Sequence, residues 1–200
     1  MWRARRGEHG NLRDLIHYKM MNITIAPREP NALTMPGDDS MMLEMDEITI
    51  VDIPSQKVLG ITKTGSYQLI PELLMKVIGY IGTEKITITG PPVFLCHETL
   101  PESVTVANET GTAVVEVAWP VAGTVRGSQD IRAYELPGGK MVHAVHFGPY
   151  AECEPKYIRL FAWIREKGLT IDRPIREVYP NDPREVKPEE IITEIYVPVA

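Results

Sequence analysis

The residue with the most distinctive chemistry is Glu177, which lies in a short apolar segment. Side chains alternate between the two faces of a strand, so Ile175, Glu177 and Tyr179 share one face. A carboxylate buried there without a partner is unfavourable, and a cationic ligand would relieve that cost while aromatic rings add cation–π attraction. The competing interpretation is an ion pair with Arg173 or Arg176 on an exposed edge strand.

Aromatic side chains lie on or beside the predicted strands and turns. Most aromatic residues pack in protein cores, and that is the competing interpretation here. A subset that lined a groove would suit a flat, apolar and cationic molecule. The aromatic residues on or beside these strands and turns are Tyr67, Phe94, Trp119, Phe147, Tyr150, Tyr179 and Tyr196.

The histidines favour structural roles over metal binding. His143 and His146 are three residues apart on a predicted strand and therefore point to opposite faces. His97 follows a strand, and we expect it to make a satisfied polar contact. The sequence has no glycine-rich phosphate loop and no HExxH, CxxC or GxSxG motif. We therefore predict no metal site and no cofactor.

An internal repeat organises the elements that must hold these residues. A shift of 83 residues lays residues 48–97 over 131–180 with nine identities and aligns Phe94 with Glu177. The carboxylate thus belongs to one unit only, as expected for a site added to a duplicated scaffold. After a shorter loop, a shift of 78 aligns Glu116 with Glu194, which indicates a shared structural role for these two residues.

Each unit follows the order β-β-α-β-β. The first has strands over 48–53 and 57–63 across a short turn, a helical stripe from Ile70 to Ile81, and strands near 92–97 and 113–121. The second has a helical stripe from Tyr157 to Ile164 and strands near 175–179 and 191–199. One helix covers only one face of its strands. We therefore predict an α+β fold of duplicated β-α-β-β units, 48–121 and 131–199, with antiparallel sheets about a pseudo-two-fold axis and a ligand groove between the units.

Composition and charge limit the function classes. The chain is 44% hydrophobic and 24% charged, as in soluble globular proteins. It has neither an apolar run of membrane-helix length nor a secretory signal, which predicts a cytoplasmic protein without a membrane partner and with Cys96 and Cys153 as free thiols.

The charge is distributed unevenly. The net charge is −6, and residues 41–200 carry −7, an acidic balance that argues against direct nucleic-acid binding. Residues 1–44 have the composition of a flexible lead-in to a domain spanning residues 45–200.

Four motifs resemble the second half of the GyrI-like small-molecule-binding domain, which is also the effector-binding module of AraC- and MerR-type multidrug regulators. They are an H-x-G-P-Y turn (His146–Tyr150), a W-I…G-L helix end (Trp163–Leu169), a P-x-x-E-x-Y-x-x-D-P strand (Pro174–Pro183) and a closing T-E-I-Y-V-P-V. The match is weaker in the first half, where Lys63–Tyr67 stands for the turn. The resemblance implies a groove for apolar, often cationic, aromatic compounds, with Glu177 as the pocket glutamate. From it we predict Tyr67, Phe147, Tyr179 and Tyr196 as the surrounding aromatic residues, and we add Phe94, the counterpart of Glu177 in the first unit, to this ligand-binding set. The resemblance also implies a stand-alone member without the regulators' DNA-binding domain.

Three functions follow from these interpretations. The first is a sensing or sequestering protein that binds lipophilic cationic or aromatic compounds. The second is a hydrolase of strained, cyclopropane-type natural products, with Glu177 as general base and Tyr67 or Tyr179 as proton donor. The third is an adaptor that docks on a separate regulator. A haem-binding function, suggested by fold kinship with the SOUL family, ranks last because neither His143 nor His146 has a context for axial ligation.

Overall fold

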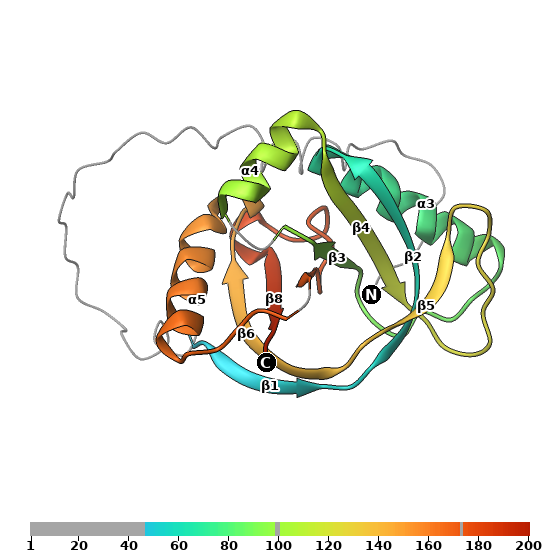
Figure 1. Ribbon diagram of the computed structural model, residues 1–200. Helices are drawn as coiled ribbons and strands as arrows, with labels where there is room; N and C mark the ends of the chain where they lie inside the picture. The colour runs from blue at the N-terminus through green and yellow to red at the C-terminus, as the bar shows by residue number, and fades with distance from the viewer. Residues whose placement is uncertain (1–46, 99–100, 173) are drawn as a thin grey trace.

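The computed structural model describes residues 47–98, 101–172 and 174–200, so the predicted lead-in lies outside the described residues. Within these ranges, eight strands form one antiparallel sheet that curls strongly (Figure 1). The strands are β1 (Thr49–Ile53), β2 (Gln56–Gly65), β3 (Val93–Cys96), β4 (Ala113–Pro120), β5 (Arg132–Leu136), β6 (Gly139–Phe147), β7 (Ile175–Val178) and β8 (Ile192–Pro198). The helices are α3 (Ile70–Thr83), α4 (Pro101–Thr110) and α5 (Glu154–Glu166), with short 3-10 turns η1 (Tyr67–Leu69), η2 (Tyr150–Glu152) and η3 (Pro188–Glu190).

The strand order is β1-β6-β8-β7-β3-β4-β2-β5. The counterparts in the two predicted units are β1 and β5, β2 and β6, β3 and β7, and β4 and β8. If each strand is replaced by its counterpart, the order read from one edge becomes the order read from the other edge. Descent from a duplication stays a prediction. The halves meet where β3 pairs with β7, and there Phe94 lies directly opposite Glu177.

The first strand of each unit pairs with the other unit. Strand β1 pairs with β6, and β5 pairs with β2, so the turn at Pro54 and Ser55 does not form a hairpin. Instead, the chain passes from one half of the sheet to the other at this turn. The two halves are therefore joined at the crossing as well as at the central strand pair.

The two predicted helices are confirmed, and each buries one stripe. Helix α3 has Pro71 in its first turn, where a missing N–H is tolerated, and buries Leu73 and Val77 against β2 and β4. Helix α5 packs against β6 and buries Leu160 and Ile164. Helix α4 was not predicted, because its described residues carry no continuous apolar stripe that periodicity could detect.

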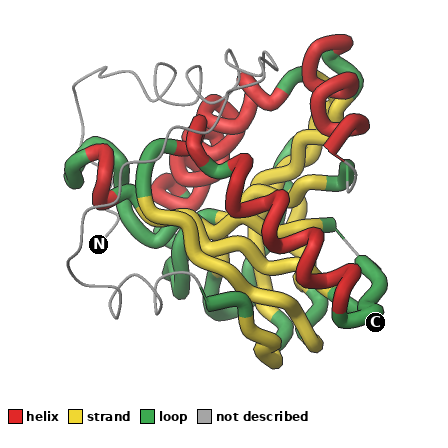
Figure 2. Tube along the Cα trace, turned by 90° about the vertical axis from the view of Figure 1, so that its left-hand side faces the viewer, coloured by secondary structure: helices red, strands yellow, loops and turns green. Residues whose placement is uncertain are grey.

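The sheet has a helix-covered face and an opposite face. Figure 2 shows a helix crossing the strands on the side that carries α5. The larger core lies between the helices and the sheet and includes Leu59, Val117 and Trp119. A smaller apolar cluster, with Val58 and Val93, lies on the opposite face. Among the described residues, none of the helices combines the length and the apolar character that a bilayer crossing requires.

Candidate functional site

The carboxylate of Glu177 is buried on the helix-covered face, with the residue only 4% exposed. The Tyr157 hydroxyl, from α5, donates to Oε1 at 2.6 Å, and the Tyr179 hydroxyl donates to Oε2 at 2.7 Å. Strand β7 lies between β8 and β3, so it is not an edge strand. The predicted alternative of an exposed edge strand is therefore wrong, and alternation turns Arg176 to the opposite face. Arg173 lies outside the described residues.

The two phenols that hold Glu177 keep their protons. Burial, followed by the negative charge of Glu177, raises the pKa of Tyr157 and of Tyr179 well above the ordinary value of 10.0. Each phenol can therefore donate a hydrogen bond to a carboxylate at any physiological pH. Donors of this kind reduce the cost of burying a charge, since an unpaired buried carboxylate is strongly disfavoured.

Aromatic rings pack on the same face of the sheet as the carboxylate. Phe94 lies across the β3–β7 pair, and the Tyr67 ring meets it edge to face with centroids 5.5 Å apart. Tyr150 meets the ring of Tyr179, the residue that donates to Oε2, edge to face with centroids 5.4 Å apart. The result is a carboxylate set among aromatic groups drawn from both halves of the sheet.

A second carboxylate lies near this cluster. The Tyr67 hydroxyl donates to Oε2 of Glu98 at 2.7 Å and lies 3.7 Å from the Cys96 sulfur. Burial raises the pKa of the Cys96 thiol to about 12, and the nearby charges of Glu177 and Glu98 act in the same direction. Cys96 is thus held as a thiol and is not an activated nucleophile.

The structure brings four of the six predicted ligand-binding residues together: Glu177, Tyr179, Tyr67 and Phe94. It does not bring Tyr196 to them. Its ring stacks on His143 on the opposite face, and its hydroxyl donates to Glu194 at 2.7 Å. Phe147 lies at the end of β6, is 40% exposed, and by alternation shares that opposite face with His143.

Sequence reasoning missed two contributors to the cluster, Tyr157 and Tyr150. Both were visible, Tyr157 in the helical stripe and Tyr150 at the end of the H-x-G-P-Y turn. A hydroxyl-bearing aromatic residue on a stripe that must face the strand of a lone glutamate is the signal that would have identified Tyr157.

The other polar candidates lie outside this cluster. His97 Nε2 is 2.7 Å from Oε2 of Glu116, and the Tyr134 hydroxyl donates to the other oxygen of the same carboxylate. These contacts confirm the structural interpretation of His97 and Glu116. Burial raises the pKa of Glu116, but the bonds from His97 and Tyr134 outweigh it, so the pKa lies below its ordinary value. His146 Nε2, on the other face of β6 from His143, lies 3.1 Å from the Pro149 carbonyl oxygen.

Comparison with known proteins identifies the fold family. The family model for the GyrI-like small molecule binding domain matches residues 46–200. The chain belongs to this GyrI-like family. No curated protein matches the chain.

Three solved proteins share the fold of this GyrI-like domain. EcmrR in a complex with DNA has a TM-score of 0.66 at 21% identity over 76% of this chain and 57% of that chain, so the present chain spans little more than half of it. The EcmrR C-terminal domain has a TM-score of 0.63 at 22% identity, covering 77% of this chain and 97% of that one.

The other two are more distant. A hydrolase encoded by lin2189 from Listeria innocua has a TM-score of 0.55 at 15% identity, covering 78% of this chain and 92% of that one. SAV2435 bound to tetraphenylphosphonium has a TM-score of 0.53 at 16% identity, covering 77% of this chain and 94% of that one. At these identities the likenesses establish the fold.

Proposed function

We propose that this GyrI-like domain binds small lipophilic cations on its helix-covered face, with Glu177 as the counter-charge, and acts as a sensing or sequestering protein. One observation carries the proposal: a carboxylate that is 4% exposed sits among aromatic rings and accepts hydrogen bonds from two phenols. Phenols are neutral donors, so these two bonds place no positive charge beside the carboxylate.

The chemistry of this cluster matches a cation with an apolar body. A cation held over an aromatic face gains about 0.5 to 2 kcal/mol, and more where water is excluded. Phe94, Tyr67, Tyr150 and Tyr179 supply such rings, while the Glu177 carboxylate supplies the charge. Membership of a small-molecule-binding family and the tetraphenylphosphonium named for SAV2435 support the same ligand class.

The test is a calorimetric titration of the full chain with tetraphenylphosphonium and with neutral triphenylphosphine oxide. We expect the cation to bind more tightly, and we expect Glu177→Gln to weaken cation binding by about tenfold or more, because a charge-assisted contact is lost. Binding of the neutral compound should not change. Glu109→Gln, a substitution on the exposed side of α4, is the matched control.

The opposite result is equally clear. If Glu177→Gln bound every lipophilic cation as tightly as the unmodified chain, Glu177 would not be the counter-charge. Turnover of a cyclopropane-type electrophile that disappears in Glu177→Gln would replace the binding function with the hydrolase function. A salt-sensitive complex with a regulator, unaffected by this substitution, would favour the adaptor.

A further inference from the structure

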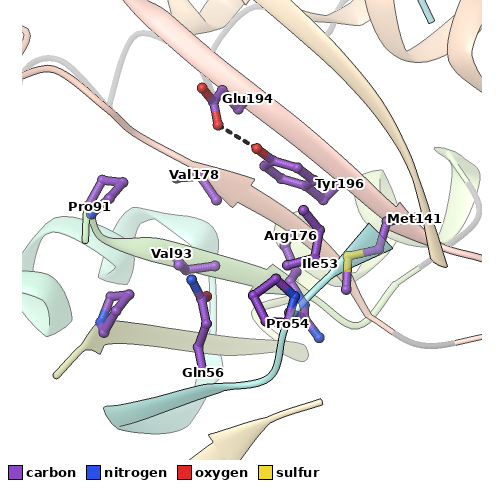
Figure 3. Close-up of a pocket in the computed structure, with 11 residues that line it drawn as sticks. Ile53, Pro54, Gln56, Pro91, Val93, Met141, Arg176, Val178, Glu194 and Tyr196 are labelled. Carbon is purple, nitrogen blue, oxygen red and sulfur yellow. Dashed lines mark hydrogen bonds between the residues drawn. The ribbon is translucent and has the colours of Figure 1, made fainter. Parts of the chain in front are cut away.

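A hollow of about 240 Å³ lies on the opposite face of the sheet from Glu177 (Figure 3). Its boundary is the crossing segment between β1 and β2, the start of β3, the end of β4, and strands β6, β7 and β8. Arg176 and Val178 line this hollow, and they flank Glu177 in the sequence while facing the other way. The full thickness of the sheet therefore separates the hollow from the Glu177 cluster.

Most of the wall is apolar and stiff. Figure 3 shows Ile53, Val93, Met141 and Val178 around the space, and Val93 and Met141 are fully or almost fully buried. Three prolines complete this part of the lining: Pro54, Pro91 and Pro120. Proline has a fixed φ and no N–H, so these segments hold their shape and offer no backbone donor.

Two charged groups face the hollow from neighbouring strands. Arg176 is 5% exposed, and one of its guanidinium N–H groups donates to the Pro137 carbonyl at 2.5 Å. Glu194 accepts a hydrogen bond of 2.7 Å from the Tyr196 hydroxyl. Since Arg176 pairs with Tyr196 and Val178 pairs with Glu194, the two charges are offset by two residues along the strands. Their side chains leave β7 and β8 toward opposite ends of the hollow in Figure 3.

We propose that this hollow is a second ligand site, for a small carboxylate with a single-ring apolar body. The guanidinium of Arg176 is a fork of N–H donors whose geometry matches a carboxylate, and burial strengthens that contact. The apolar body lies against Val93, Val178 and Met141. At the far end, Glu194 and the Tyr196 hydroxyl accept a hydrogen bond from an amine or hydroxyl substituent. At its Arg176 end the site therefore selects a carboxylate, the opposite charge from the one proposed for the Glu177 face.

The test uses three compounds of one shape on the full chain: benzoate, 4-(aminomethyl)benzoate and benzylamine. We expect 4-(aminomethyl)benzoate to bind at millimolar or lower concentration, benzoate several-fold more weakly, and benzylamine weakest. Methyl NMR signals of Val93, Val178 and Met141 should shift on titration. Preferred binding of benzylamine, or shifts confined to residues around Glu177, would overturn the proposal, as would no binding of either carboxylate.

Variants separate this site from the Glu177 site. Arg176→Gln should weaken the binding of both carboxylates by about tenfold, because a charge-assisted contact is lost. Glu194→Gln is the second variant, since Glu194 is only partly buried and its loss is tolerable for the fold. It should remove the advantage of 4-(aminomethyl)benzoate over benzoate and leave benzoate binding unchanged.

Reciprocal controls complete the design. Glu177→Gln should bind the carboxylates normally, and Arg176→Gln should keep its affinity for tetraphenylphosphonium. The second site would be refuted if Arg176→Gln bound both carboxylates as tightly as the unmodified chain and Glu194→Gln kept the preference for 4-(aminomethyl)benzoate over benzoate, whatever the outcome for the cation.

Discussion

At the scale of single residues, the defining feature is a carboxylate held by two phenols. Replacing either phenol leaves one carboxylate oxygen of Glu177 without that donor inside the core. We expect Tyr157→Phe and Tyr179→Phe each to lower the free energy of unfolding by about 1.5 to 3 kcal/mol, the range for hydrogen bonds to charged groups. Urea denaturation measures the change.

A matched control is available on helix α3. The Tyr80 hydroxyl donates to the Arg126 carbonyl at 3.1 Å in an exposed position, so Tyr80→Phe removes the same atom without affecting a buried charge. A loss of stability in Tyr80→Phe as large as in the two core variants would show that the hydrogen bonds to Glu177 stabilise the fold no more than an exposed hydrogen bond does.

Glu116, whose carboxylate contacts His97 and Tyr134, predicts a specific dependence of stability on pH. Its folded pKa lies below the ordinary value of 4.5, so its stabilising contribution is complete above that value and is lost as pH falls through the folded pKa. Glu116→Gln should therefore be less stable than the unmodified chain at neutral pH, and the difference should shrink as pH falls below 4.5. Urea unfolding from neutral pH down to pH values below 4.5 checks this, with Glu109→Gln as the exposed control. A difference that is independent of pH would contradict it.

Sequence could predict Glu177 but not all of its neighbours. The alternation of side chains within one strand is local, and it placed Glu177 and Tyr179 together. Tyr196 could not be placed in this way, because its face depends on the pairing of β8 with β7, where Ile195 lies opposite Glu177. A shift of one residue in that pairing would have exchanged the two faces.

At the scale of elements, helix α5 positions Tyr157, which donates a hydrogen bond to Glu177. Its position, and with it that of Tyr157, depends on the apolar stripe packed against β6. We expect Leu160→Ala to cost about 2 to 5 kcal/mol, because it removes a fully buried side chain and leaves a cavity. Thermal or urea unfolding measures it.

The control lies two residues away on the same helix. Ile158 is 60% exposed, so Ile158→Ala should change stability by no more than about 0.5 kcal/mol. If both variants were equally destabilised, α5 would not bury the stripe that positions Tyr157.

Elements with a strong periodic pattern were predictable, and those without one were not. The stripes of α3 and α5 and the β-branched strands followed from local sequence. Helix α4 had no such pattern, and the crossing between β1 and β2 involves a non-local choice of partner. A short turn between two strands usually forms a hairpin, and nothing local at Pro54 and Ser55 indicates the exchange.

At the scale of the whole molecule, the two halves share one eight-stranded sheet, so we expect them to unfold as a single cooperative unit. Strands β3 and β7 lie at the centre of the sheet, while β1 and β5 are its edges and are paired on one side only. Amides of β3 and β7 should therefore exchange hydrogen slowest, with the same opening free energy, and those of β1 and β5 should exchange about tenfold faster or more. Hydrogen-exchange mass spectrometry of the full chain measures both.

The outcome distinguishes one unit from two. Opening free energies for β3 and β7 that differ by more than about 1.4 kcal/mol, a factor of ten in the equilibrium, would mean that the halves open separately. Equal values would agree with the exchanged edge strands, which bind each half to the other.

The strand order also determines when the helix-covered face, with Glu177, can form during synthesis of the chain. Strand β8 is inserted between β6 and β7, although it follows both of them in the sequence. Strand β1 cannot pair until about ninety further residues have been synthesised, since Thr49 pairs with His143. Pairings over such distances slow folding, because the chain loses entropy before it gains contacts. The nascent chain therefore exposes unpaired strand edges until β8 has left the ribosome, and that interval is when we expect it to be most prone to aggregation.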